Sequence, residues 1–425
     1  MIYYTNGQYP PVTNPTSHPP HRRKASDNHH GSHRPLLSDR PDIHFPVDVD
    51  AIIVPTMRNV ATLDAAIQLA GKLGSTLVTL CSKWSSADEV ARRVARKGVR
   101  LVAIDVEKIP ADVIPSFETD RVLARTRFKR NADTSLKRNL GLFLARLIGW
   151  QRVVFLDDDI EIPEPTDLRE AAGLTGHYAG VGLAIDGMPD NSVVCHAFRE
   201  AGGAQDMFIG GGALAIGPQL MSSFFPNIYN EDWFFLLDDD RLRPTTTTGK
   251  AVQKVYDPFR EGRARQEELG DCLAEGLVWL LDNGRSLRDA TAEHWRGFLR
   301  RRADFITDVL GMVERMGGDP AVRHRMMLSL KEARGRCQSI EPELCVRYVD
   351  AWRADRKKWR RHLEDTERKV AAGLTKQDRR SVVGVRKMLR ELGFTDETAH
   401  LHVPPERLHH DSADFDPAFP IAVGQ

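Results

Sequence analysis

Short apolar runs alternate with amphipathic segments through the first half of the chain. Runs rich in β-branched and aliphatic residues predict strands at residues 51–56, 76–80, 99–105 and 153–156. Apolar stripes with helical spacing predict helices at residues 62–73, 87–97 and 133–150. Strands and helices that alternate at this spacing are typical of a parallel sheet with helices packed on its faces.

The hydrophobic pattern changes after residue 263, where only helical stripes follow. These stripes predict helices at residues 266–281, 295–313, 344–359 and 382–392. Both ends of the chain are rich in Pro and His and lack apolar periodicity, which is typical of disordered segments. We therefore expect a disordered tail (1–45), an α/β domain (46–283), a helical C-terminal region (284–395) and a loosely ordered tail (396–425).

An apolar strand that ends in three carboxylates is the main chemical feature of the sequence. Asp157, Asp158 and Asp159 directly follow the strand at residues 153–156, at the edge where open α/β sheets bind ligands. Because side chains alternate along a strand, we expect Asp157 and Asp159 to point one way and Asp158 the other. Two carboxylates about 6–7 Å apart along a strand can share one Mg²⁺ or Mn²⁺, whose other positions are filled by water and substrate phosphates. The alternative is a solvated turn that binds no ligand.

Three further groups of residues could serve the same site. Lys137 and Arg138 fall in the first turn of the helix before this strand, where free backbone N–H groups favour an anion. The three glycines Gly210–Gly212 permit either close approach to a ligand or a bulge. Glu231 and Asp232 stand at the start of an aromatic helix or turn, as functional groups or only as caps.

In their order along the chain, these pieces resemble nucleotide-diphospho-sugar glycosyltransferases with the GT-A fold, closest to the family 2 type. The resemblance covers residues 48–280. Its strongest part is a helix that starts with Arg138-Asn139 and leads into the strand bearing the Asp-x-Asp element. Its second part is the glycine loop followed by the Glu-Asp pair. The resemblance implies an α/β, Rossmann-like GT-A fold with a mostly parallel sheet and helices on both faces.

The resemblance also implies roles for individual residues. At the Asp-x-Asp, Asp159 would hold Mg²⁺ or Mn²⁺, and Asp157, within reach of the same ion, would face the ribose or sugar. The metal would neutralise the diphosphate leaving group as a Lewis acid. Asp232 would take the proton from the acceptor hydroxyl as general base, and Glu231 would orient the acceptor or donor sugar. The other residues implied to bind the nucleotide sugar are Pro55, Thr56, Arg58, Lys137, Arg138, Asp158, Gly211 and Gly212.

The sequence departs from the family pattern at three points. The second strand lacks the acid that usually binds the base, and Asp105 on the third strand is the candidate to replace it. A third metal ligand is not obvious, and Asp257 is the candidate for it. The Gln-x-x-Arg-Trp element of processive synthases is absent, so we expect single transfers.

Composition and charge exclude several classes of partner. The formal net charge is +1 and 41% of the residues are hydrophobic, which argues against a nucleic-acid or membrane-surface protein. No apolar run reaches the roughly 20 residues that span a bilayer. Five scattered cysteines fit a reduced, cytoplasmic setting. The expected partners are a nucleoside-diphosphate sugar and an unidentified acceptor, and the helices of residues 284–395 could also form a homodimer.

Two other functions compete with the transferase. A haloacid-dehalogenase-type phosphatase also carries Asp-x-Asp after an apolar strand, and Asp238–Asp240 could imitate its later acid motif. That class expects Thr or Val where this chain has Glu161, and its core usually begins with the acidic strand, whereas three predicted strands come first here. The other is a non-catalytic protein that only binds a nucleotide sugar or acts as a scaffold. Such a protein has no need for Asp157, Asp159 and Asp232 together.

Overall fold

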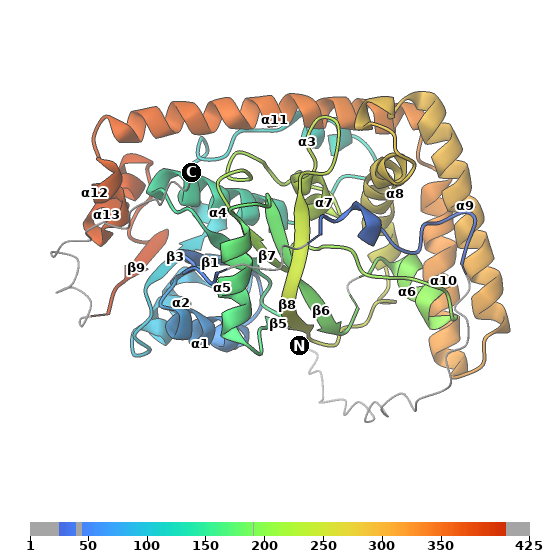
Figure 1. The fold of residues 1–425 in the computed structure, drawn as a ribbon, viewed down its shortest axis with the longest axis horizontal. Helices are drawn as coiled ribbons and strands as arrows, with labels where there is room; N and C mark the ends of the chain where they lie inside the picture. The colour runs from blue at the N-terminus through green and yellow to red at the C-terminus, as the bar shows by residue number, and fades with distance from the viewer. Residues whose placement is uncertain (1–24, 40–44, 190, 405–425) are drawn as a thin grey trace, which may run out of the picture.

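A nine-stranded sheet forms the centre of the part of the protein that the computed structural model describes, residues 25–39, 45–189 and 191–404 (Figure 1). The strands are β1 (Ala51–Thr56), β2 (Thr76–Cys81), β3 (Leu101–Asp105), β4 (Val153–Leu156), β5 (Ile160–Glu161), β6 (Gly180–Gly187), β7 (Ala213–Ile216), β8 (Thr245–Gln253) and β9 (Ala399–His402). They lie in the order β5-β8-β6-β7-β4-β1-β2-β3-β9.

The sheet is mixed, with one run of parallel strands around β1 and a separate parallel pair, β6 and β8. β1 pairs in parallel with β2 and β4, β2 with β3, and β6 with β8. The pairs β3–β9, β4–β7, β5–β8 and β6–β7 are antiparallel. The predicted parallel arrangement therefore holds for β4, β1, β2 and β3, whose carboxyl ends share one edge. Because β7 runs against β4, the loop before β7 also reaches that edge.

Helices cover both faces of the sheet, as predicted. Alternate strand residues enter two separate cores, so that Ile53 and Phe155 face one core while Ile52 and Val154 face the other. The helices are α1 (Asp64–Leu73), α2 (Ala87–Val94), α3 (Glu118–Ala124), α4 (Thr134–Ile148), α5 (Pro165–Leu174), α6 (Val193–Glu200), α7 (Glu231–Leu236), α8 (Arg263–Asp282), α9 (Ala292–Arg315), α10 (Pro320–Cys337), α11 (Pro342–Ala371), α12 (Lys376–Arg380) and α13 (Val382–Glu391). The core around Ile52 contains α1, α2 and α5, and the larger core around Ile53 contains α4, α7 and α8.

The predicted helical C-terminal region is confirmed as helical, and it shares a core with the sheet. Trp295 in α9 and Trp352 and Trp359 in α11 are fully buried and join Ile53 in one continuous hydrophobic cluster. The long helix α11 runs along one side of the molecule, where it contacts α3 and α4 (Figure 1). None of the helices in the described part of the chain has the length and hydrophobicity that a membrane crossing requires.

Parts of the two predicted tails are ordered, which corrects the prediction for those parts. Residues 25–39, called the strap below, cross the C-terminal helices, with His29 and His33 only 7% and 4% exposed. The strap is tied to the fold by backbone hydrogen bonds, among them Asp206 N to Gly31 O at 2.7 Å. At the other end, β9 pairs with β3 and covers that edge of the sheet. Neither segment has an apolar pattern of its own. Each is stabilised by partners far along the chain.

Candidate functional site

The three carboxylates follow β4, but they do not continue its alternation. Asp158 and Asp159 form a turn, with a hydrogen bond from Ile160 N–H to Asp157 O at 3.1 Å. Because the extended backbone has ended, Asp158 and Asp159 both reach Arg58, whereas Asp157 contacts a different arginine. The expectation that Asp157 and Asp159 share one side and Asp158 the other is therefore wrong.

The end of β1 binds the two acids of this turn. Thr56 Oγ1 donates a hydrogen bond to Asp158 at 2.7 Å, and Arg58 pairs with Asp158 through Nη1. Arg58 Nη2 lies 2.8 Å from Asp159 Oδ2. Since the Arg58 side chain is 45% exposed, solvent screens these ion pairs and the guanidinium can exchange partners at little cost.

Arg138 connects the acids after β4 with the acids at the start of α7. Its side chain is 4% exposed, with Nη2 at 2.9 Å from Asp157 Oδ1 and Nη1 at 3.0 Å from Glu231 Oε1. Glu231 also lies 3.5 Å from Arg130. A guanidinium has a rigid fork of donors, so it fixes both carboxylates at once. Arg138 and Glu231 thus form a buried ion pair inside the site.

Two opposing effects determine the pKa of Asp157. Withdrawal from solvent raises the pKa of Asp157 to about 6, while the charge of Arg138 opposes the rise. The side chain keeps 36% of its surface exposed. Asp157 is therefore ionised at neutral pH, but its charge depends on Arg138 staying in place.

Lys137, in the first turn of α4, is buried and borders the cavity at the ends of β1 and β4. Its side chain is 2% exposed, and its ammonium donates to Thr56 O at 2.9 Å, Ser82 Oγ at 2.7 Å and Asp133 Oδ1 at 3.0 Å. An ammonium has three donors, and all three are used here. Lys137 therefore ties the ends of β1 and β2 together and has no donor left for a base or diphosphate.

The glycine loop lies against the charged cluster because β7 pairs with β4. Asp157 N–H donates to Gly212 O at 2.9 Å. A Cβ atom on Gly211 would lie 2.4 Å from Arg138 Nη1 and 2.9 Å from Asp232 Cβ, and one on Gly212 would lie 3.4 Å from Asp157 Oδ2. The two glycines thus permit close approach of the protein's own charged side chains.

Asp232 is fixed at the start of α7 by backbone groups. Its Oδ2 accepts from Gly211 N–H at 2.5 Å and its Oδ1 from Trp233 N–H at 2.9 Å. The helix follows Asn230, whose φ of 58° lies in the left-handed region that residues with side chains rarely adopt. The Asn230 amide donates to Asp271 in α8 at 3.1 Å. Strained residues of this kind are typical of functional sites.

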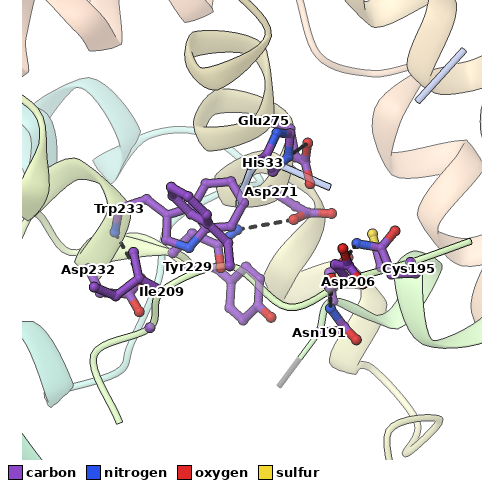
Figure 2. Close-up of a pocket in the computed structure, with 15 residues that line it drawn as sticks. His33, Asn191, Cys195, Asp206, Ile209, Tyr229, Asp232, Trp233, Asp271 and Glu275 are labelled. Carbon is purple, nitrogen blue, oxygen red and sulfur yellow. Dashed lines mark hydrogen bonds and ion pairs between the residues drawn. The ribbon is translucent and has the colours of Figure 1, made fainter. Parts of the chain in front are cut away.

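Two cavities border the cluster. The larger, about 160 Å³, is lined by the ends of β1 and β4 and the first turn of α4, including Pro55, Arg58 and Asp157–Asp159. The smaller, about 50 Å³, is lined by Asp232 together with residues of the strap, α6, the loop before β7 and α8. Figure 2 shows its lining, with Asp232 and Trp233 on one side and Asn191, Cys195 and Asp206 on another.

Two of the predicted residues lie outside both cavities. Asp105 ends β3, and its carboxylate accepts the Ala87 N–H at the start of α2 at 2.7 Å. Asp257 pairs with Arg325 of α10 at 2.8 Å. The structure therefore does not bring Asp105 to the lining where a base would bind, nor Asp257 to the acids after β4.

His33 is a lining residue that the sequence pattern does not reveal. Its imidazole lies 3.0 Å from Glu275 and 2.6 Å from Asp282, both in α8. Burial lowers the pKa of His33, but these two carboxylates raise it to about 10, so the ring is charged at neutral pH. A histidine in a segment rich in Pro and His carries no local signal for this contact, because its partners lie far along the chain.

The cysteines also gather in ways that their spacing along the chain does not indicate. All five are buried and free. Two groups hold ligand-type atoms within 4.8 Å of one another, His29–Cys195–Glu275 and Glu268–Cys272–Cys337. In each group one residue is already hydrogen-bonded to a side chain outside the group. His29 Nε2 lies 2.7 Å from Gln205 Oε1, and Glu268 accepts from Arg302 at 2.9 Å.

Comparisons with known proteins add little to this geometry. No protein-family model and no curated protein matches the chain. A solved structure that it resembles is the mannosyltransferase PcManGT from Pyrobaculum calidifontis, in complex with GDP-Man and Mn²⁺. The two chains share 14% sequence identity and a TM-score of 0.34, over 85% of this chain and 91% of that chain. A likeness this low supports no argument about activity, so the functional proposal depends on the geometry of the site.

Proposed function

We propose that this protein is a metal-dependent glycosyltransferase that moves a sugar from a nucleoside-diphosphate sugar to an acceptor hydroxyl. The observation that carries the proposal is a pair of cavities connected by one charged cluster. Asp157 and Asp159 line the larger cavity and Asp232 lines the smaller, while Arg138 and Gly211 connect them. Group transfer needs such a pair, because a donor and an acceptor must meet at one point.

The larger cavity is suited to the donor. Arg58 is partly exposed and held only by screened ion pairs, so it can turn to a phosphate oxygen, which a guanidinium binds well. Pro55 and Thr56 at the end of β1 form the adjacent wall, where we place the ribose and base. Lys137 also lines this cavity and supports the wall, since its ammonium donates to Thr56 O.

The acids of this cavity fit a hard divalent cation. Asp157, Asp158 and Asp159 face two guanidinium groups, those of Arg58 and Arg138, so the cluster keeps an excess of negative charge. Carboxylate oxygens are the ligands that Mg²⁺ and Mn²⁺ prefer, with positions left for substrate phosphates. Asp159, 22% exposed, would hold the ion with Asp157 beside it. When bound, the ion would neutralise charge on the diphosphate leaving group.

The smaller cavity is suited to the acceptor, with Asp232 as its general base. A base must lie within hydrogen-bond reach of the hydroxyl proton, and Asp232 is held at the cavity wall by two backbone N–H groups. Glu231 does not line either cavity. We propose that it acts through Arg138, which it holds against Asp157.

The phosphatase alternative is less compatible with the site. It needs a further acid motif beside the acids after the strand. The candidate turn at Asp238–Asp240 lines neither cavity and is bound by Arg288 and Arg356.

The proposal is tested first by thermal melting with UDP-, GDP- and dTDP-sugars, each with and without Mn²⁺. A ligand at a hundred times its Kd stabilises the native state by about 2.7 kcal/mol, which is easily detected. We expect a shift with one nucleotide class, and only with metal. Absence of any shift across the panel would contradict the proposal.

Two variants separate the donor side from the acceptor side. Asp159→Ala should lose metal-dependent donor binding, whereas Asp232→Asn should bind the donor normally and lose transfer. Asp88→Asn, which changes a carboxylate that is 59% exposed on α2, is the matched control and should behave as wild type. Equal donor affinity in Asp159→Ala and wild type would refute the metal assignment.

A further inference from the structure

The smaller cavity, called the acceptor cavity below, is assembled from segments far apart in the chain. The strap supplies His33, the segment before α6 supplies Asn191, the loop before β7 supplies Asp206, and α7 and α8 supply Asp232 and Glu275 (Figure 2). Its volume of about 50 Å³ is enough for one polar group or the edge of a sugar ring. A ligand bound there would contact side chains from these segments.

Groups that accept hydrogen bonds and carry negative charge dominate the lining. Among the described residues, four carboxylates border the cavity, those of Asp206, Asp232, Asp271 and Glu275, and no Arg or Lys lines it. His33 is the one cationic side chain among the lining residues that the structure describes, so the formal charge of these five groups is −3. Such a lining repels an anionic acceptor and attracts a cation.

One buried atom of the lining lacks a hydrogen-bond donor. Asn191 is 9% exposed, and its amide nitrogen donates to Asp206 O at 3.3 Å. Its Oδ1 is buried and has no partner among the described residues. A buried hydrogen-bond acceptor left without a donor is destabilising, so this atom points to a ligand that supplies an N–H or O–H group.

The charges of the lining are not equally available to a ligand. Glu275 is paired with His33, and Asp271 is paired with Arg302 of α9. The Asp206 carboxylate is exposed and forms no ion pair with any residue of the described chain. Asn191 Oδ1 and the Asp206 carboxylate are therefore available hydrogen-bond acceptors in a corner of the cavity, on the side opposite Asp232 in Figure 2.

Aromatic side chains complete the cavity. Trp233 and Phe208 line it and pack edge to face with ring centroids 5.0 Å apart. Tyr229 lines it as well. Aromatic faces attract ammonium groups, and they also pack against the C–H faces of sugar rings.

Building on the proposed function, we infer that the acceptor is a hydroxyl-rich molecule that carries a protonated amine, such as an amino sugar or an aminocyclitol. Its ammonium donates to Asn191 Oδ1 and to the Asp206 carboxylate, and its reacting hydroxyl lies at Asp232. In the transfer, the hydroxyl oxygen bonds to the anomeric carbon of the donor as the bond from that carbon to the diphosphate breaks. The hydroxyl proton passes to Asp232.

The inference is tested with matched acceptors and the donor identified by thermal melting. Glucosamine and 2-deoxystreptamine are the amine probes, glucose and N-acetylglucosamine the neutral ones, and glucuronate the anionic one. Transfer is measured by mass spectrometry and donor hydrolysis by release of nucleoside diphosphate. We expect kcat/KM for an amine probe to exceed that for the neutral probes by about tenfold, which corresponds to 1.4 kcal/mol, with glucuronate lowest.

Variants locate the preference in the acceptor cavity. Asp206→Asn should reduce the ratio of amine to neutral kcat/KM by about tenfold, and Asn191→Ala should reduce it in the same direction. Asp186→Asn, an exposed carboxylate in β6 that lies outside the lining, should leave the ratio unchanged.

Failure of the inference is distinguishable from failure of the proposed function. A metal-dependent donor shift combined with equal use of amine and neutral probes, or with a preference for glucuronate, overturns the acceptor class alone. A preference for amines that survives Asp206→Asn overturns the assigned corner. Absence of any donor shift overturns the proposed function and this inference with it.

Discussion

Replacement of Gly211 by Ala tests how closely the two halves of the site are coupled. The added Cβ would lie 2.4 Å from Arg138 Nη1 and 2.9 Å from Asp232 Cβ, whereas ordinary van der Waals contact begins at 3.4 Å. Arg138 Nη1 must therefore move by about 1 Å, the difference between 2.4 Å and the 3.4 Å of ordinary contact. The ends of long side chains usually move easily, but both terminal nitrogens of this guanidinium, Nη1 and Nη2, are held in ion pairs at 3.0 and 2.9 Å.

The displacement should reduce activity more than stability. A shift of about 1 Å takes at least one of the Arg138 ion pairs beyond hydrogen-bond range and moves Asp157 or Glu231 with it. Misplacement of this size costs on the order of 100-fold in rate. Overpacking costs about 1–3 kcal/mol of folding free energy, so the protein should remain folded.

The assay is the initial rate of sugar transfer or donor hydrolysis, with thermal melting measured in parallel. Gly212→Ala is the neighbouring comparison, because its Cβ would meet the flexible end of Ile160 at 2.6 Å and would lie 3.4 Å from Asp157 Oδ2, the limit of ordinary contact. We expect a smaller loss of rate there. Gly297→Ala, where nothing lies within 4 Å of the new Cβ, is the control and should keep full activity. A folded Gly211→Ala protein with wild-type kcat/KM would refute the coupling.

Two further predictions concern the ordered parts of the tails. Because the pKa of His33 is raised to about 10 from 6.5, the folded state holds a proton that the unfolded chain releases between these values. The stability that His33 contributes is complete below pH 6.5 and falls as pH rises towards 10, by up to about 1.4 kcal/mol per pH unit. Urea denaturation should therefore show a gap between wild type and His33→Gln that narrows from about pH 7 to about pH 9. A gap independent of pH would contradict the assignment. Truncation of residues 396–425 removes β9 and exposes the edge of β3, so we expect a lower melting temperature and more light scattering, and an unchanged protein would refute this role.

Much of the fold follows from local pattern. The runs at residues 51–56, 76–80 and 153–156 become strands at nearly the predicted bounds, because β-branched residues in short apolar runs pack well in a sheet buried on both faces. The helix that begins at Thr134 ends before Gly149, whose φ of 85° suits a left-handed cap. The placement of Asp157–Asp159 at the strand edge follows from the same local signals.

The partners of the site residues depend on tertiary structure. Lys137 and Arg138 are neighbours in sequence, but one ties β1 to β2 while the other binds Asp157 and Glu231. Only the antiparallel pairing of β7 with β4 brings Gly211 against Arg138. Local sequence does not encode which strand becomes a neighbour.

The strap, β9 and the acceptor cavity depend wholly on long-range contacts. His33 and Glu275 lie 242 positions apart, and neither has a neighbour in sequence that indicates the other. By itself the sequence determines where strands, helices and acidic edges form, because periodicity and side-chain shape act over a few residues. Tertiary structure alone decides which charges face each other, because burial and ion pairing arise only when distant segments pack together.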